Sequence, residues 1–248
     1  MNLQDFFKEQ PAVALAFSGG VDSAYLLYAA HQYGAKVTAY YVKTLFQPQF
    51  EYDDAVKLAA QLGAKMKTIP LDVLCDESIT ANPANRCYYC KKRIFSAILD
   101  AAKADGFSLV IDGTNASDDA SDRPGMVALR EMKVRSPLRE AGLTKAEIRR
   151  LSKEAGLFTH DKPAYACLAT RIPTGTAITK ERLEKTEICE EYLKSMGFTD
   201  FRIRLFHGAA RVQLPEAQLP MLLEKRSEIL AFLKQHYPAV LLDMEVRG

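Results

Sequence analysis

The chain of 248 residues is 48% hydrophobic, and its 33 Lys and Arg nearly balance its 31 Asp and Glu. This length allows one large domain or a main domain with a smaller one, and the near-neutral charge argues against a protein that holds nucleic acid through a broad positive field. No apolar run approaches the roughly 20 residues that span a bilayer, and the N-terminal residues MNLQDFFKEQ lack the pattern of a signal peptide. We therefore expect a cytoplasmic protein with neither a membrane nor a nucleic acid as partner.

Apolar, β-rich segments alternate with helical patterns over the first part of the chain. We expect strands at 12–17, 36–42, 66–71, 109–112 and 134–138. Helical patterns begin near Tyr25 and cover 55–62 and 94–104, and a further helix begins at Thr144, forms a capping box with Glu147 and ends at Gly156. This alternation predicts an α/β fold in which a Rossmann-like parallel sheet is covered by helices on both faces, over residues 1–158.

The rest of the chain, 159–248, predicts a smaller α+β domain. It opens with HDKPAYACLATRIPTG, a linker rich in small residues that carries a candidate site. A helix over 179–196, stopped by Gly197, precedes two short strands, RIRLF and ARVQL, with His207 and Gly208 at the turn between them. A helix from Pro215 to Gln235 and a last strand over 240–246 complete this domain.

The hexapeptide SGGVDS follows the first predicted strand and has the features of a phosphate-binding loop. Gly19 and Gly20 permit unusual dihedral angles and close backbone approach, and the N-terminus of the next helix favours an anion. Ser18 and Ser23 add hydroxyl donors, whereas Asp22 would repel phosphate unless it caps the helix or holds a divalent cation. The alternative is a tight turn capped by Asp22. The motif lacks the lysine of a Walker loop, so transfer of the γ-phosphate is not expected.

A second polar segment, DGTN, ends the predicted strand over 109–112. Asp112, Gly113, Thr114 and Asn115 therefore lie at the carboxyl edge of the sheet, where ligands of such folds bind, and could contact adenine, ribose or metal. The alternative is an Asx-type turn.

Three of the five cysteines are candidate metal ligands. Cys87 and Cys90 form a CxxC motif followed by Lys91, Lys92 and Arg93, whose charge lowers the pKa of a thiol, and Cys167 precedes Arg171. A CxxC motif also occurs in redox pairs and zinc sites, or as two small core residues. Three thiolates would leave one iron of a four-iron cluster without a protein ligand, able to carry sulfide.

The other cysteines and two histidines favour structural roles. We expect Cys75 and Cys189 in the core and His207 in a hairpin turn. His160 could complete a zinc site with the three cysteines, but a lone histidine in a linker is more often a surface or capping group.

The hexapeptide resembles the SGGxDS loop of the PP-loop ATP pyrophosphatases, which split ATP between its α- and β-phosphates. Together with RCYYCKK, DGTN, DRPG at 122–125, RSPLREAGLTKAEIR, CLATRIPTG and RIRLFHGAARV, in this order over most of the chain, it is similar to the LarE family. That family makes the nickel-pincer nucleotide cofactor by placing sulfur in the carboxylates of pyridinium-3,5-biscarboxylic acid mononucleotide. The resemblance implies an adenine nucleotide alpha hydrolase-like PP-loop domain, ATP and Mg²⁺, and assembly as a hexamer.

The resemblance also implies roles for individual residues. Cys87, Cys90 and Cys167 would bind a [4Fe-4S] cluster that carries the sulfide delivered to the adenylated substrate. Ser18, Gly19, Gly20, Asp22 and Ser23 would hold the pyrophosphate, and the residues expected to be catalytic are Cys167, Asp22 and Lys92. The candidates for contact with the mononucleotide are Tyr88, Lys92, Arg171, Glu190, Glu191, Arg204 and Arg211. At Ser117 the family more often has an acidic residue, which argues against a metal there.

Three other functions stay open. In one branch of the family the cysteine that matches Cys167 gives up its own sulfur and becomes dehydroalanine. A tRNA thiolase also joins a PP-loop to a three-cysteine cluster, although the near-neutral charge of this chain argues against tRNA. The non-enzymatic alternative is a zinc-stabilised nucleotide-binding protein.

Overall fold

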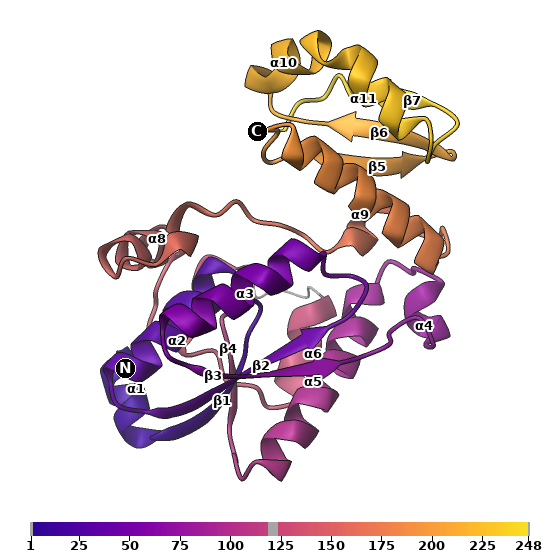
Figure 1. Cartoon of the computed structure of the whole chain (residues 1–248). Helices are drawn as coiled ribbons and strands as arrows, with labels where there is room; N and C mark the ends of the chain where they lie inside the picture. Colours follow the sequence, from indigo (N-terminus) through magenta and orange to yellow (C-terminus); the bar gives the residue numbers. More distant parts are fainter. Residues whose placement is uncertain (1, 119–123, 248) are drawn as a thin grey trace. The chain divides into compact units, whose positions relative to one another are not determined.

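A computed structural model of the chain describes residues 2–118 and 124–247 (Figure 1). The chain divides into two compact units: Met1–Val73 with Asn85–Lys162, and Leu74–Ala84 with Pro163–Gly248. The first unit thus extends a little beyond the boundary predicted at 158, and residues 74–84 pack with the second unit, which the sequence did not predict. Of the DRPG motif, Asp122 and Arg123 lie outside the described residues.

The first unit contains a parallel sheet of four strands in the order β3-β2-β1-β4. The strands are β1 (Ala12–Ala16), β2 (Lys36–Lys43), β3 (Lys65–Pro70) and β4 (Val110–Asp112), which confirms four of the five predicted strands and the α/β class. The strand predicted at 134–138 is wrong. Only an isolated bridge joins Arg135 to Ile111, and Pro137 starts the short helix α7 (Pro137–Glu140), because its fixed φ suits the first turn of a helix and it lacks an N–H to donate to a sheet.

Helices cover both faces of this sheet, as Figure 1 shows. Successive strand residues point to opposite faces. On one face Val13, Leu15 and Ile111 pack with α1 (Leu3–Glu9), α2 (Val21–Gln32), α3 (Gln49–Gln61) and α8 (Lys145–Glu154). On the other, Ala14 and Tyr40 pack with α5 (Arg86–Ala104) and α6 (Pro124–Glu131). Three of these helices, α2, α3 and α5, start earlier than predicted, at Val21, Gln49 and Arg86. The capping box at the start of α8 is confirmed.

The second unit combines a three-stranded sheet with helices. Its strands β5 (Arg202–Phe206), β6 (Ala209–Gln213) and β7 (Val240–Leu242) lie in the order β5-β6-β7, and α9 (Lys180–Ser195) precedes them. His207 and Gly208, with φ of 47° and 85°, form the turn of the β5–β6 hairpin, which confirms the predicted turn. Helix α9 confirms the helix predicted over 179–196. The single helix predicted from Pro215 is instead η3 (Glu216–Gln218), α10 (Leu219–Glu224) and α11 (Arg226–Leu233), interrupted at Lys225.

Asn82 holds the segment 74–84 in the second unit. This segment contains α4 (Glu77–Thr80), and Asn82 follows it with a φ of 55°, a conformation that asparagine tolerates better than most residues. Its side-chain nitrogen donates to the carbonyls of Pro173 at 2.8 Å and Thr176 at 3.1 Å, and its own carbonyl accepts from Gly175 at 2.8 Å. The segment before the CxxC motif is thereby tied to the chain that follows Cys167.

Two glycines bring the backbone close together around the SGGVDS loop of the first unit. A Cβ on Gly19, whose φ is +72°, would lie 2.8 Å from Cβ of Ala55 in α3. A Cβ on Gly113, just after β4, would lie 2.8 Å from the backbone nitrogen of Ser23. Contacts below 3.0 Å are not tolerated by real side chains, so both positions need glycine. None of the described helices is both apolar and long enough to traverse a bilayer.

Replacing Gly19 by Ala should destabilise the chain more than replacing Gly34 by Ala. Both glycines have a φ of +72°, so the strain of about 1–2 kcal/mol for a left-handed residue is common to both. Only Gly19 has a neighbour within reach of the added methyl group. In urea-induced unfolding we expect Gly34→Ala to lower the free energy of unfolding only by this shared strain. Gly19→Ala should lower it further and should bind ATP more weakly. Equal losses in the two variants would contradict the close approach.

Candidate functional site

The SGGVDS loop links the carboxyl end of β1 to the N-terminus of α2. The hydroxyl of Ser23 organises it: Oγ of Ser23 donates to the carbonyl of Gly20 at 3.2 Å and accepts from the backbone nitrogen of Ser18 at 3.3 Å. Gly20 is the N-cap of α2, and no side-chain hydrogen bond from this cap blocks the first turn. The backbone N–H groups at the start of α2 therefore suit a phosphate, as the sequence predicts.

Asp22 is held by two residues from distant parts of the first unit. Oδ2 accepts from Nζ of Lys145 at 2.5 Å, and Oδ1 accepts from Nδ2 of Asn115 at 3.3 Å. The side chains of Lys145 and Asp22 are 35% and 22% exposed, so water reaches this ion pair. Asp22 is therefore an acidic residue of the loop with a cationic partner rather than a cap, and its carboxylate is a donor type that suits Mg²⁺.

The DGTN segment forms the Asx-type turn that was the alternative to a ligand site. Asp112 accepts from the backbone nitrogen of Thr114 at 3.3 Å and from its hydroxyl at 2.6 Å, and from Oγ of Ser136 at 2.6 Å. These contacts occupy both carboxylate oxygens of a buried residue. Asp112 thus shapes the turn, and Asn115 is the member of the segment whose side chain reaches the SGGVDS loop. Contact of this segment with a nucleotide stays a prediction.

The CxxC motif lies on the first turn of α5 rather than in a loop. Cys87 and Cys90 are three positions apart on this helix, so their side chains share one face. Cys87 is exposed and Cys90 is half-buried. Nη2 of Arg86 lies 3.9 Å from Sγ of Cys87, a contact between a guanidinium and the sulfur. The two thiols are accessible from one side, beside cationic groups.

Tyr88 and Lys92, on the same helix, meet Glu131 of α6. The hydroxyl of Tyr88 donates to Glu131 at 2.7 Å, and Nζ of Lys92 lies 3.2 Å from both Tyr88 Oη and the Glu131 carboxylate. The hydrogen bonds to Tyr88 and then to Glu131 raise the pKa of Lys92, and those from Tyr88 and Lys92 lower the pKa of Glu131. Both charged forms are therefore favoured at neutral pH. The substrate and catalytic roles of Tyr88 and Lys92 stay predictions.

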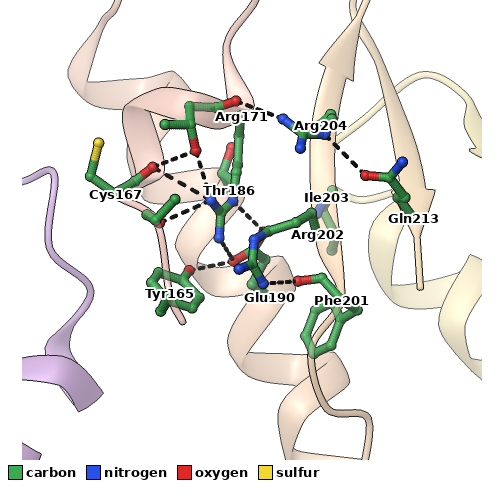
Figure 2. A network of polar contacts seen from close by, with 12 residues as sticks. Tyr165, Cys167, Arg171, Thr186, Glu190, Phe201, Arg202, Ile203, Arg204 and Gln213 are labelled. Carbon is green, nitrogen blue, oxygen red and sulfur yellow. Dashed lines mark hydrogen bonds and ion pairs between the residues drawn. The ribbon is translucent and has the colours of Figure 1, made fainter. Parts of the chain in front are cut away.

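A buried ion pair in the second unit fixes the backbone of Cys167 (Figure 2). Cys167 is the N-cap of η2 (Leu168–Arg171). Arg171, 1% exposed, binds Glu190 of α9 through Nε at 2.8 Å and Nη2 at 3.1 Å, and Nη1 donates to the carbonyl of Ala166 at 2.9 Å. Thr170 donates to the carbonyl of Cys167 at 2.8 Å. In Figure 2 the sulfur of Cys167 points away from the guanidinium of Arg171, and the hydrogen bonds drawn to Cys167 end on its main-chain carbonyl.

Tyr165 contacts two guanidinium groups of this network. The Cζ atoms of Arg171 and Arg202 are 4.6 Å and 5.0 Å from the centre of its ring, and its hydroxyl donates to Glu190. Burial and then the charge of Glu190 raise the pKa of Tyr165, so its hydroxyl keeps its proton. Glu190 also accepts from the backbone nitrogen of Ile203 at 2.9 Å. Burial alone would lower the pKa of Arg171, but Glu190 raises it, and the guanidinium stays charged.

The other predicted substrate contacts are spread over the second unit. Arg204 donates to the carbonyl of Thr170 at 2.9 Å, and burial and then the charge of Arg171 lower its pKa. Arg211 pairs with Asp243 at 3.3 Å, and Glu191 is exposed on α9. The structure therefore brings Arg171, Glu190 and Arg204 together with Cys167, and it does not place Glu191 or Arg211 among their hydrogen-bond partners. Contact of these residues with a ligand stays a prediction.

The residues expected to be structural behave differently from one another. Cys189 is fully buried, and burial raises the pKa of its thiol to about 12, which confirms a core role. Cys75 is exposed, so the prediction that it lies in the core is wrong. It follows strand β3 and belongs to the segment 74–84. His160 contacts the carbonyl of Leu157 at 3.0 Å through Nδ1, a local contact.

Within residues 2–118 and 124–247, no group of three or more Cys, His, Asp and Glu side chains is placed to hold a metal ion. Cys87 and Cys90 belong to the first unit and Cys167 to the second. By donor type the thiolates fit an iron–sulfur cluster, and the shared helix face of Cys87 and Cys90 fits two ligands of one metal centre.

Four residues with evident roles in these clusters were not predicted: Lys145, Glu131, Tyr165 and Arg202. Arg202 carries a signal that could have been used, since it alternates with Arg204 along the strand RIRLF. Lys145 stands directly after the predicted N-cap Thr144, but its contact with Asp22 joins residues 123 positions apart. No local pattern reveals such a contact.

Comparison with known proteins gives close relatives, although no family model matches the chain. Over 222 residues it is 37% identical to an uncharacterised protein of Synechocystis sp., covering 88% of this chain and 82% of that protein. It is 36% identical over 214 residues to the pyridinium-3,5-bisthiocarboxylic acid mononucleotide synthase of Lactiplantibacillus plantarum, covering 86% and 78%. A tRNA-specific 2-thiouridylase, MnmA, of Pseudothermotoga lettingae is 27% identical over 60% of this chain and 53% of that protein.

The glycine loop at the carboxyl edge of a parallel sheet, together with these relatives, defines an ATP-dependent sulfur-transferring enzyme of the PP-loop class. Within that class the chain belongs to the family of pyridinium-3,5-bisthiocarboxylic acid mononucleotide synthases, the LarE family. The resemblance found in the sequence motifs is thereby confirmed, and the non-enzymatic alternative is set aside.

The pair Arg171–Glu190 should behave as a buried unit in a double-mutant cycle. Its side chains are 0% and 5% exposed. Arg171→Met or Glu190→Met leaves one buried charge alone, so each should lower the free energy of unfolding by about 3–5 kcal/mol, and the double variant should lose much less than the sum. Circular dichroism in a urea series measures this. The control is Arg150→Met in the pair Arg150–Glu154, whose side chains are 61% and 59% exposed, with a loss of at most about 1 kcal/mol. Arg171→Met no more costly than this control would refute the role of the pair.

Proposed function

We propose that this chain adenylates a carboxylate of pyridinium-3,5-biscarboxylic acid mononucleotide with ATP and Mg²⁺ and then replaces AMP by sulfur, as a step in nickel-pincer nucleotide biosynthesis. The observation that carries the proposal is the SGGVDS loop, which leads into a helix N-terminus without a side-chain cap. The chain that contains it is related over most of its length to a pyridinium-3,5-bisthiocarboxylic acid mononucleotide synthase. That relative is named for its product, the bisthiocarboxylic acid mononucleotide, which supports a carboxylate as the group that changes.

In the first step the loop holds the part of ATP that leaves. The substrate carboxylate oxygen attacks the α-phosphorus, the bond from that phosphorus to the bridging oxygen breaks, and pyrophosphate departs. We infer that the N–H groups of the first turn of α2 stabilise the negative charge that develops on pyrophosphate, and that the hydroxyls of Ser18 and Ser23, which lie 3.1 Å apart, leave their partners within the loop to donate to it. Asp22 supplies the carboxylate for Mg²⁺.

In the second step sulfide attacks the carbonyl carbon of the acyl adenylate, AMP leaves, and a thiocarboxylate remains. We assign Cys87, Cys90 and Cys167 as the thiolate ligands of a [4Fe-4S] cluster that supplies this sulfide. Two observations support the assignment. Cys87 and Cys90 share an accessible helix face beside Arg86, and the buried network around Arg171 includes hydrogen bonds to the main-chain carbonyls of Ala166 and Cys167. Arg171 and Glu190 then act by positioning Cys167.

The mononucleotide brings its own phosphate, which needs cations. Arg204 and Arg211 face each other as a cross-strand pair in the β5–β6 hairpin, where each could bind a phosphate oxygen. Assembly into a hexamer, which the resemblance to the LarE family implies, is part of this proposal.

The first test mixes the purified chain with ATP, Mg²⁺ and the dicarboxylate mononucleotide. We expect AMP and pyrophosphate in equal amounts only when the mononucleotide is present, and exchange of labelled pyrophosphate into ATP, because adenylation is reversible before sulfur arrives. Asp22→Asn should lower this exchange by at least about 100-fold. Exchange with tRNA, and none with the mononucleotide, would favour a thiolase like the MnmA relatives.

The second test concerns the sulfur. After anaerobic purification we expect about four irons per chain, and Cys87→Ala, Cys90→Ala and Cys167→Ala should each lose them. With added sulfide, product should exceed enzyme. Cys75→Ala is the control, since Cys75 is an exposed cysteine outside the proposed ligands. One product per chain, with a mass loss at Cys167 that marks dehydroalanine, would instead establish the sacrificial route.

A further inference from the structure

We propose that Lys162 is a positioning residue, which fixes the start of the linker that carries Cys167 relative to the SGGVDS loop. This inference rests on the proposed function, in which Cys167 takes part in sulfur transfer. Lys162 is the last residue of the first unit, and Cys167 follows it by five positions. Five residues span at most about 18 Å when fully extended, so the place where the chain leaves the first unit limits where the thiol can lie.

The side chain of Lys162 ends among the first residues of α3. Its Nζ atom lies 2.7 Å from Oδ2 of Asp54, 3.1 Å from Oε2 of Glu51 and 5.8 Å from the centre of the Phe50 ring. The side chains of Lys162 and Glu51 are only 14% and 12% exposed, so water and salt screen this ion cluster weakly. Glu51 and Asp54 are three positions apart on the helix and face the same ammonium group, so its removal would leave two neighbouring carboxylates without this cation.

The main chain of Lys162 is held as well. Arg149 of α8 donates to the carbonyl of Lys162 at 2.9 Å through Nη2 and to that of His160 at 2.6 Å through Nη1. The backbone nitrogen of Lys162 donates to the carbonyl of Thr159 at 3.2 Å. Its ψ of 125° is the extended conformation that a residue before proline favours, and Pro163 follows. Two helices, α3 and α8, therefore fix the direction in which the chain leaves the first unit.

Helix α3 also lies against the SGGVDS loop. Ala55, the residue after Asp54, is the neighbour that leaves no room for a side chain at Gly19. The same two turns of α3 thus contact the loop on one side and the start of the linker on the other. A change in the ion cluster should therefore move the linker relative to the loop, while the hydrogen bonds within the loop stay in place.

The substitution Lys162→Met should separate the two chemical steps. Exchange of labelled pyrophosphate into ATP, at a saturating concentration of the dicarboxylate mononucleotide, depends on the loop and should stay within about twofold of the wild-type rate. Formation of the thiocarboxylate from added sulfide should slow by about 10- to 100-fold, because a displacement of about 1 Å at a reacting group costs up to about 100-fold. Mass spectrometry of the product in a single turnover measures this second rate.

A second measurement needs no substrate. The amides of His160 and Lys162 donate to the carbonyls of Leu157 and Thr159 in the turn before the linker. Their hydrogen exchange, followed by mass spectrometry of peptides that cover 157–162, should be at least about 10-fold faster in Lys162→Met, because local opening becomes easier. Arg149→Met removes the main-chain contacts instead and should have the same effect.

Two further variants separate positioning from a loss of stability. The double variant Lys162→Met/Glu51→Gln removes the cation together with one of its carboxylates, so it should regain thermal stability but not the rate of thiocarboxylate formation. Lys67→Met breaks another ion pair of the first unit, with Asp105 at 2.5 Å, and should change neither the ratio of the two rates nor the exchange of the linker amides. Thermal melting followed by circular dichroism reports the stability of each variant.

The possible outcomes separate the inference from the proposed function. Slow thiocarboxylate formation with normal pyrophosphate exchange, in Lys162→Met and in the double variant, supports the positioning role. Equal losses in both rates, no loss in either, or recovery of the second rate together with stability in the double variant would refute it. If the wild-type chain shows no pyrophosphate exchange with the mononucleotide, the proposed function is refuted and the role of Lys162 in it as well, whereas faster amide exchange in Lys162→Met would still establish that Lys162 holds the linker.

Discussion

The packing of the first unit depends on two close contacts at the SGGVDS loop, which leave no room for a side chain at Gly19 or Gly113. Gly19 lies against Ala55 of α3, and Gly113 lies against the backbone of Ser23. Because these contacts bring the backbone after β4 up to the start of α2, the side chain of Asn115 can reach Asp22. A methyl group at either glycine would push these segments apart, and the polar contacts around the loop would lengthen together.

The two units use charge in different ways. In the first, the ion pair of Asp22 and Lys145 is open to water, so its partners can be exchanged at small cost. In the second, Arg171 and Glu190 are buried and bound on nearly every polar atom, so they form a fixed support. A pair that is open to water suits a site whose partners exchange, whereas a buried pair suits a main chain that is held in one position, such as that of Cys167.

The sequence predicts the regular parts of the fold because those parts are encoded locally. Four strands, the capping box of Thr144 and the hairpin turn at His207 follow from periodicity and turn chemistry. Its errors have local causes as well, such as Pro137 starting a helix. The motif residues were found, but their partners were not. The contacts of Lys145 with Asp22 and of Glu131 with Tyr88 join residues far apart in the chain, and only the folded backbone brings them together.

The segment 74–84 makes the second unit discontinuous in sequence. The chain passes between the units at 73/74, at 84/85 and at 162/163. The second unit is therefore not a C-terminal module that evolution could exchange by a single recombination event. A gene fragment that ends at the linker would encode Ile79 and Asn82, 0% and 1% exposed in the full chain, without the residues that bury them. A fragment that starts at the linker would lack the segment 74–84 of its own unit. The two units must accordingly be inherited, expressed and redesigned as one piece.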